Sequence, residues 1–351
     1  MRILCVAGSR GERAKLSPVI ARLERDQDLT CTYVSRSGTV PTWDAGSPPP
    51  PALSLEVNDA TPVLRAGAVV RWLEPQLEEL RPEIVLICGS SDAAVGAALA
   101  ASFPGIPLAH LDAGVVADSG PNSRLLDQAS TFLIAPHIEA VQRLAQRGME
   151  DAAFLCGDTL ADGLPAEAAP VAVDADAPCL CYLGGAALES AGLPIVLAAL
   201  IGLAKPFLLP AGPPARIRLG EALRKAQAHS GEAPSGEAAQ GPATQRVVLQ
   251  DAIRIVEPMD YAAMQAAVAR APVVITDSPT LQRECYFHGT VAVGLAPAGF
   301  PDAERSGWVR PVAMDEEAIM KAAQAPPPTT APEVEAHRGA GERAASFVTG
   351  L

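Results

Sequence analysis

A glycine turn followed by two cations stands directly after the first apolar run of the chain. Residues 3–6 are apolar, Gly8 follows, and Arg10 and Lys15 lie in the amphipathic segment after it. Glycine permits a tight turn, and the unpaired N–H groups at a helix start can bind an anion. These residue types in this order indicate an anion site, although two cations near a helix start are also common on a solvated surface.

Acid–base residues follow two later apolar runs. Asp92 opens an Ala-rich helical segment after the run 84–88, and His110 and Asp112 end the short run that begins at Pro107. Carboxylate and imidazole groups at strand ends can carry protons in a ligand site. The sequence leaves two interpretations of His110 open: a side chain that faces the ligand, or a strand-end histidine that is hydrogen-bonded to the backbone.

Apolar runs alternate with amphipathic segments along both halves of the 351-residue chain. These are the elements that must position the polar residues named above. The alternation predicts parallel, doubly wound α/β sheets, and the length predicts two domains. Ligands of such folds bind at the carboxyl ends of the strands, here in a cleft between two Rossmann-like domains. We expect an N-terminal domain over 1–164, a linker over 165–178, a C-terminal nucleotide-binding domain over 179–330, and a tail over 331–351 whose helix, over 333–347, packs back on the first domain.

The composition argues against several classes of function. A net charge of −13, from 40 acidic and 27 basic residues, leaves no basic footprint for nucleic acid. The seven cysteines lack the paired spacing of a zinc site and indicate reduced thiols in the cytoplasm. The chain opens without a secretory signal, and its longest apolar stretch, 192–209, is interrupted by Pro194 and Lys205, which disfavours a membrane span. No cluster of His, Asp and Glu indicates a metal.

Three motifs connect these features to one family. Residues 7–15 are similar to a segment that contains Gly-Thr-Arg-Pro-Glu-Ala-x-Lys, residues 106–114 to Ile-Pro-Val-x-His-Val-Glu-Ala-Gly, and residues 277–284 to Asp-Ser-Gly-Gly-x-Gln-Glu-Glu. Over residues 1–310 the chain thereby resembles the non-hydrolysing UDP-N-acetylglucosamine 2-epimerases. The resemblance implies a GT-B fold of two Rossmann-type domains, a UDP-sugar as the bound partner, no cofactor, and a homodimer.

The resemblance also implies roles for individual residues. The residues that would hold the nucleotide sugar are Gly8, Arg10, Lys15, Ser278, Pro279, Thr280 and Glu284. Ser278 would bind a phosphate oxygen, and Glu284 would accept hydrogen bonds from the ribose hydroxyls, since a carboxylate can take two adjacent hydroxyls at once. Without the resemblance, the same two residues are equally well a helix cap and a surface glutamate.

The chain departs from the family pattern at the positions that would carry out the reaction. The family reaction eliminates UDP and adds it back after proton exchange at C2, which needs a base and an acid on two faces of the sugar. Ser90 stands where the family has aspartate, Asp112 stands for a glutamate, and Asp118 lies near the place of two missing glutamates. Gly184 and Gly185 replace part of a charged motif, and they open the alternative of a phosphate-cradling loop. The candidate catalytic residues are Asp112, Asp118, Asp92 and His110.

Three functions therefore stay open. The first is an epimerase that uses Asp112, with Asp118 or Asp92, as proton carriers. The second is a glycosyltransferase or another enzyme that cleaves the sugar–nucleotide bond, because a leaving diphosphate is stabilised by cations and helix termini rather than by paired carboxylates. The third is a non-catalytic protein that binds UDP-sugars or serves as a scaffold.

Overall fold

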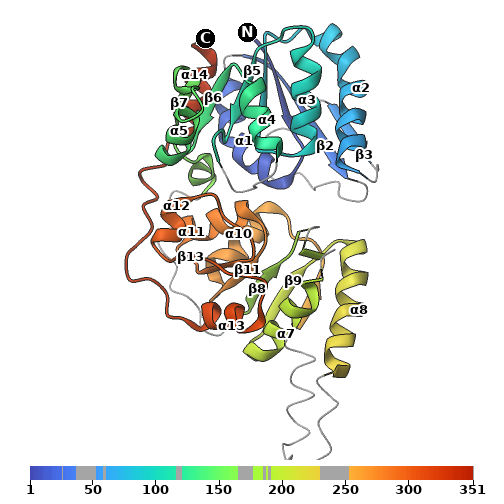
Figure 1. The fold of residues 1–351 in the computed structure, drawn as a ribbon, viewed down its shortest axis with the longest axis vertical. Coiled ribbons are helices and arrows are strands. Elements are labelled where there is room, and N and C mark those ends of the chain that lie inside the picture. Colours follow the sequence, from blue (N-terminus) through green and yellow to red (C-terminus); the bar gives the residue numbers. More distant parts are fainter. Residues whose placement is uncertain are drawn as a thin grey trace, which may run out of the picture. The chain divides into compact units, whose positions relative to one another are not determined.

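The structure is a computed structural model, and it describes residues 1–25, 27–36, 53–57, 61–115, 121–164, 177–184, 187–188, 191–229 and 253–350 (Figure 1). The chain divides into two compact units. The N-terminal unit comprises Met1–Glu167 and Glu333–Leu351, and the C-terminal unit comprises Ala168–Pro332. None of the helices in the described part of the chain is long and apolar enough to cross a bilayer.

The N-terminal unit is built on a seven-stranded sheet in the order β3-β2-β1-β4-β5-β6-β7, and every described pairing is parallel. The strands are β1 (Arg2–Ala7), β2 (Asp28–Arg36), β3 (Leu53–Val57), β4 (Ile84–Cys88), β5 (Leu108–Leu111), β6 (Phe132–Ala135) and β7 (Ala153–Leu155). Because β1, β4 and β5 are neighbours, the turns that follow them lie side by side at one edge of the sheet.

Helices cover both faces of this sheet (Figure 1). They are α1 (Arg10–Leu23), α2 (Pro62–Leu80), α3 (Asp92–Ser102), α4 (Pro121–Ala129), α5 (Ile138–Ala145) and α14 (Ala340–Thr349), with short 3-10 turns at Glu150–Ala152 and Thr159–Gly163. Alternate residues of β1 enter different cores. Ile3 and Cys5 pack with α1 and α14, whereas Leu4 and Val6 pack with α2 and α3. Burial on both faces explains why the strands read as unbroken apolar runs.

The C-terminal unit repeats this architecture with six parallel strands in the order β10-β9-β8-β11-β12-β13. The strands are β8 (Cys179–Tyr182), β9 (Phe207–Pro210), β10 (Ile253–Val256), β11 (Val274–Thr276), β12 (Ala292–Gly294) and β13 (Val309–Pro311). The helices are α7 (Leu193–Leu203), α8 (Pro213–His229), α10 (Tyr261–Arg270), α11 (Pro279–His288), α12 (Pro301–Arg305) and α13 (Glu316–Gln324). Two parallel α/β units of Rossmann type confirm the predicted fold class.

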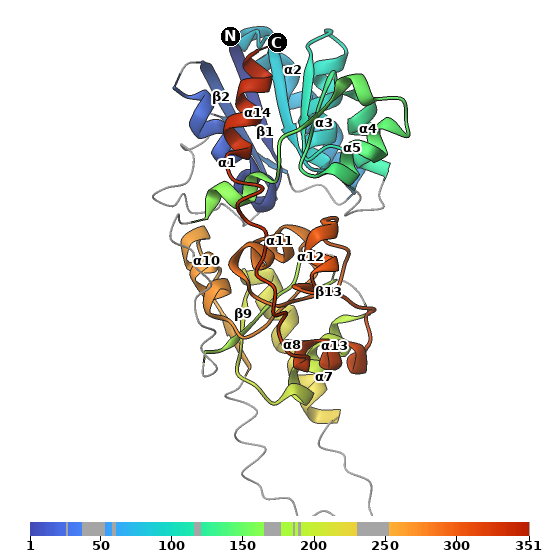
Figure 2. The same ribbon diagram turned by 90° about the vertical axis from the view of Figure 1, so that its left-hand side faces the viewer.

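The end of the chain returns to the N-terminal unit, where α14 lies along α1 (Figure 2). The Phe347 ring stacks on the ring of Phe154 with a centroid distance of 4.4 Å. The expected helix over 333–347 is wrong at both ends, because α14 spans Ala340–Thr349. It begins late because Gly339 has a φ of +74°, and the Asp162 carboxylate binds the N–H groups of Gly339 and Gly341 at 2.6 and 2.7 Å.

Candidate functional site

A buried ion pair joins the first helix to the end of β5. The Nζ atom of Lys15, on α1, lies 2.5 Å from Oδ2 of Asp112, the residue after β5. Only 6% of Lys15 and 9% of Asp112 is exposed to solvent. Taking two charges out of water is costly, and a partner at this distance offsets that cost. The structure thus brings together two of the sequence candidates that lie 97 positions apart.

The backbone of Asp112 has an uncommon conformation. Its φ is +74°, a value that non-glycine residues rarely adopt and that Asp tolerates better than most. The N–H groups of Asp112 and Ala113 both donate to the carbonyl oxygen of Ile134, at 3.0 and 3.1 Å. Such backbone strain concentrates at functional sites. The turn therefore aims the Asp112 carboxylate at Lys15 instead of continuing the strand.

His110 lies two residues earlier, in β5, and only 1% of it is exposed. Its Nε2 lies 2.8 Å from the carbonyl oxygen of Gly89, in the turn after β4. Its Nδ1 lies 3.0 Å from Oδ1 of Asp127, on α4. The imidazole therefore has the backbone partner that one interpretation of the sequence expects, together with a buried carboxylate that the sequence did not reveal.

Glu12 is a second carboxylate that sequence reasoning missed. It accepts hydrogen bonds from the N–H groups of Gly8 and Ser91 at 2.6 and 3.1 Å, and from the Ser91 hydroxyl at 3.0 Å. The turn after β1 is thereby tied to the turn after β4. Burial raises the pKa of Glu12 above its ordinary value of 4.5, because desolvation disfavours the ionised form more than these hydrogen bonds favour it.

Gly8 and Arg10 lie where the sequence placed them, at the start of α1. A Cβ atom on Gly8 would lie 2.4 Å from Cβ of Ala93, so only glycine lets this turn approach α3. Ser9 caps α1 by accepting a hydrogen bond from the N–H group of Glu12 at 3.1 Å. Arg10 is the first residue of the helix and is half-buried.

The other two carboxylate candidates are placed differently. Asp92 begins α3, and its Oδ2 lies 2.7 Å from both Nε and Nη2 of Arg65, on α2. A fork of two guanidinium N–H groups on one carboxylate holds Asp92 toward α2. Asp118 lies outside the described residues, so the structure gives it no position.

In the C-terminal unit, the predicted phosphate turn is the N-terminus of α11. The Ser278 hydroxyl accepts a hydrogen bond from the N–H group of Leu281 at 3.3 Å and so caps the helix. The N–H group of Ser278 donates to Oγ1 of Thr276 at 3.1 Å, and Pro279 has no N–H group. Thr280 therefore supplies the next backbone donor of this turn. Compared with a glycine at the second position, the turn has one donor fewer for an anion.

Glu284 lies farther along α11 and is buried, with 5% of it exposed.

The carboxylate of Asp277, which directly follows β11, accepts hydrogen bonds from the N–H groups of Gly184 and Ala187 at 2.6 and 3.3 Å. The Gly184 N–H group is thus already bound to a carboxylate, which argues against the phosphate-cradling loop at this residue. Gly185 lies outside the described residues.

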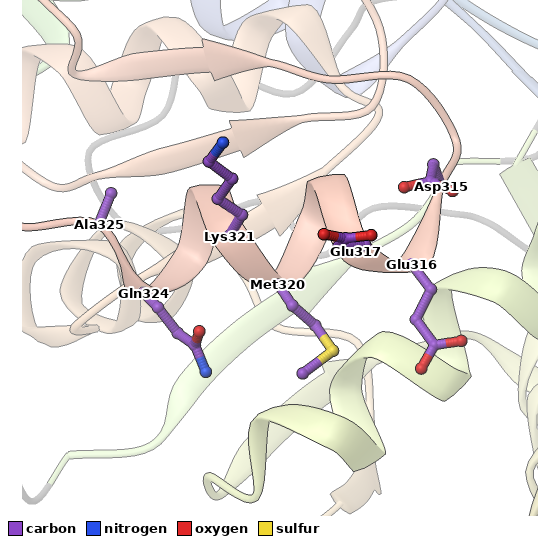
Figure 3. Close-up of a pocket in the computed structure, with 7 residues that line it drawn as sticks. All are labelled: Asp315, Glu316, Glu317, Met320, Lys321, Gln324 and Ala325. Carbon is purple, nitrogen blue, oxygen red and sulfur yellow. The ribbon is translucent and has the colours of Figure 1, made fainter.

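Other chemistry finds less support in the described part of the chain. No group of three or more His, Cys, Asp and Glu side chains there could hold a metal ion. Burial raises the pKa of Cys156, Cys181 and Cys285, which makes these thiols poor nucleophiles. An open hollow runs along α13, and Figure 3 shows Glu316, Met320 and Gln324 extending to one side of the helix and Lys321 to the other. It is lined by Asp315, Glu316, Glu317, Met320, Lys321, Gln324 and Ala325.

Comparison with known proteins identifies the family. The chain matches the family model described as UDP-N-acetylglucosamine 2-epimerase over residues 44–178 and 232–340, which is more than half of its length. The chain belongs to the UDP-N-acetylglucosamine 2-epimerase family. The family resemblance drawn from the three motifs is thereby confirmed.

Individual members of the family are distant in sequence. A UDP-2,3-diacetamido-2,3-dideoxy-D-glucuronate 2-epimerase of Pseudomonas aeruginosa is 25% identical over 346 residues, which cover 92% of this chain and 89% of that protein. The structure of Methanocaldococcus jannaschii UDP-GlcNAc 2-epimerase in complex with UDP-GlcNAc and UDP has a TM-score of 0.80 at 20% identity. The UDP-GlcNAc-bound enzyme from Neisseria meningitidis has a TM-score of 0.77 at 17% identity. Both matches cover 100% of each chain, and they confirm the GT-B fold.

Within this epimerase family, the altered positions of the chain have defined surroundings. Asp112, which stands where the family motif has a glutamate, is paired with Lys15. Ser90, which replaces an aspartate, uses its carbonyl oxygen to accept a hydrogen bond from Nδ2 of Asn122 at 3.1 Å. The chain thus has a carboxylate at one of these two motif positions and, at the other, a hydroxyl group that does not act as an acid or base near neutral pH.

Glu12→Gln tests the link between the turns after β1 and β4. In the variant, the side-chain NH₂ group of the glutamine would face the N–H or O–H donors whose hydrogen bonds Glu12 accepts. The variant should therefore lose about 1–3 kcal/mol of unfolding free energy at acidic pH. In the wild type, a folded-state pKa raised above the unfolded one means that stability falls as pH rises above about 4.5. The deficit of the variant should therefore shrink toward neutral pH, as measured by urea unfolding at several pH values.

Glu78→Gln, at an exposed position of α2, is the matched control and should change neither stability nor its pH dependence. A deficit of Glu12→Gln that stays constant or grows from pH 4.5 to 7.5 would contradict this role of Glu12.

Proposed function

We propose that the protein is a UDP-sugar 2-epimerase that removes and returns the C2 proton of the sugar and releases UDP transiently. The observation that carries this proposal is the buried Lys15–Asp112 pair at the carboxyl ends of the strands. It is supported by family membership and by relatives named as 2-epimerases of UDP-sugars. A carboxylate that is shielded from water and held in a fixed direction suits proton transfer.

In the proposed reaction, the Asp112 carboxylate accepts the C2 proton. The electron pair of the C2–H bond forms the C1–C2 double bond, and the electrons of the C1–O bond leave with UDP. UDP then adds back to C1 as a proton returns to the opposite face of C2. The Lys15 ammonium group, 2.5 Å from Asp112, stabilises the ionised carboxylate that the first step requires.

The opposite face needs a second proton carrier. Asp92 is engaged by Arg65 on α2, which makes it a poor choice. We therefore assign this role to Asp118, which lies in the segment between the described residues 115 and 121. His110 is too buried to reach the sugar and is assigned a supporting role.

The nucleotide part of the substrate is assigned to residues in each unit. Arg10, with Gly8 beside it, would contact the diphosphate from the start of α1, where a cation and helix N–H groups both favour negative charge. In the C-terminal unit, Ser278 and Thr280 would contact a phosphate oxygen. Glu284 would bind the ribose hydroxyls with its buried carboxylate.

A second candidate is cleavage of the sugar–nucleotide bond without re-addition, by transfer or hydrolysis. Two observations favour it: Ser90 stands at the position of a family aspartate, and Asp92 is ion-paired with Arg65. Cleavage alone requires only that the leaving diphosphate be stabilised. The cationic side chain of Arg10 is of a type that can stabilise it.

Incubation with UDP-GlcNAc in D₂O separates these functions. An epimerase incorporates deuterium at C2, seen by NMR, and Asp112→Asn should lower the exchange rate by a factor of about 10² to 10⁴. Asp151→Asn, which changes an exposed carboxylate of the same unit, is the control and should exchange normally. Release of UDP without deuterium at C2 would indicate transfer or hydrolysis in place of epimerisation. Binding of UDP with neither UDP-sugar cleavage nor C2 exchange would indicate a non-catalytic binding protein.

Pro279→Gly tests the phosphate turn. It restores a backbone N–H group at the start of α11, and one hydrogen bond to a charged oxygen should tighten UDP binding about tenfold in calorimetry. Pro301→Gly, which makes the same change at the first residue of α12, should leave the affinity unchanged. Arg10→Ala and Glu284→Ala should each weaken UDP binding. Unaltered affinity in Pro279→Gly would show that no phosphate binds at this turn.

We also propose that the protein is cytoplasmic and forms a homodimer. All seven cysteines are free thiols, as a reducing compartment allows. Phe103 is 85% exposed, and Leu99 and Leu125 on the packed helices α3 and α4 are 39% and 41% exposed, so apolar side chains on these helices are available to a second copy. Sedimentation should give a dimer for the wild type and a monomer for Phe103→Glu. A monomeric wild type would refute the dimer, and recovery outside the cytoplasm would refute the location.

A further inference from the structure

Asp127 is a buried carboxylate, with 1% of it exposed, to which the proposed reaction gives no role. Its Oδ1 lies 3.0 Å from Nδ1 of His110 and accepts the N–H group of Gly114 at 3.3 Å. Its Oδ2 accepts a hydrogen bond from Nη1 of Arg147, on α5, at 3.0 Å. The carboxyl group of Asp127 thus contacts β5, the turn after β5 and α5 at once.

The two ring nitrogens of His110 have different partners. The carbonyl oxygen of Gly89, 2.8 Å from Nε2, can only accept a hydrogen bond, so Nε2 carries a proton. On the other side of the ring, Nδ1 faces Oδ1 of Asp127. The imidazole is therefore held between a backbone carbonyl group and a buried carboxyl group.

These contacts clamp both turns that form the proposed site. Through His110, Asp127 fixes the carbonyl group of Gly89 in the turn after β4. Directly, it fixes the N–H group of Gly114, in the turn that begins at Asp112. The carbonyl group of Gly114 accepts a hydrogen bond from Nη1 of Arg143 at 2.6 Å. The strained Asp112 backbone, with its φ of +74°, lies between β5 and this clamped glycine.

We propose that Asp127 is a positioning residue: through its contacts with His110 and Gly114 it holds the turns after β4 and β5 in the geometry that presents Asp112 to the sugar. This inference rests on the proposed epimerase function. Asp127 acts through His110 and Gly114 and makes no contact of its own with substrate. Its loss should consequently affect turnover more than the binding of UDP, which is assigned to other residues.

The test combines NMR of ¹⁵N-labelled histidine in the full chain with kinetics. In the wild type, Nε2 of His110 should carry the proton that the Gly89 carbonyl oxygen accepts, and in Asp127→Asn this hydrogen bond should weaken. C2 deuterium exchange should fall at least tenfold in Asp127→Asn, with KM and UDP affinity within about twofold of the wild-type values. Asp162→Asn, which removes a carboxylate that binds two backbone N–H groups in the same unit, should keep normal exchange.

Each alternative result has a defined meaning. A wild-type His110 that lacks a proton on Nε2 overturns the proposal, and this observation does not depend on the folding of any variant. Wild-type exchange in Asp127→Asn overturns it, as does an equal loss of exchange in Asp162→Asn, which would indicate a general structural effect. If the wild type itself shows no C2 exchange, the epimerase function fails and the catalytic part of this proposal fails with it, whereas the NMR result still shows whether His110 is hydrogen-bonded to Gly89 as the proposal requires.

Discussion

The buried ion pair between Lys15 and Asp112 is the constraint on which the N-terminal unit depends. Lys15 contributes a positive charge from α1, and Asp112 contributes a negative charge from the turn after β5, with both side chains almost fully removed from water. A buried pair of this kind seldom adds net stability compared with an apolar pair of similar size. Its presence at the carboxyl ends of the strands is therefore better explained by chemistry than by folding.

The surrounding carboxylates serve the backbone. Glu12, Asp127 and Asp277 each accept hydrogen bonds from N–H groups in a turn that follows a parallel strand. These turns carry the polar residues of the candidate site, and their N–H groups would otherwise be buried without partners. An overall acidic chain can thus present an anion-binding site, because part of its negative charge is used internally to hold the turns.

Much of this architecture could be predicted from the sequence. Strands buried on both faces appear as continuous apolar runs, so the two parallel sheets and most helices followed from periodicity. The motifs around Arg10, Lys15 and Asp112 identified the family. The start of α14 was missed because its late beginning depends on the distant carboxylate of Asp162 and on the positive φ of Gly339.

The partners within the site were beyond sequence reasoning. Nothing in the sequence links Lys15 to Asp112, since only the neighbouring positions of β1, β4 and β5 bring them together. Glu12 and Asp127 stand in amphipathic helical segments, where an acidic residue is ordinarily on the solvated face. Pro279 removes a donor from the phosphate turn, an effect that the sequence itself indicates because proline has no N–H group.

The most direct test of the role assigned to the ion pair is the unfolding free energy of the double variant Lys15→Met/Asp112→Asn, with C2 deuterium exchange measured on the same sample. Asp112→Asn alone leaves a buried lysine without its carboxylate and should cost about 3–5 kcal/mol. If the pair is kept for chemistry, the double variant should recover wild-type stability to within about 1 kcal/mol and show no exchange. A double variant that remains as unstable as the single one, or that exchanges C2 at the wild-type rate, would contradict this account.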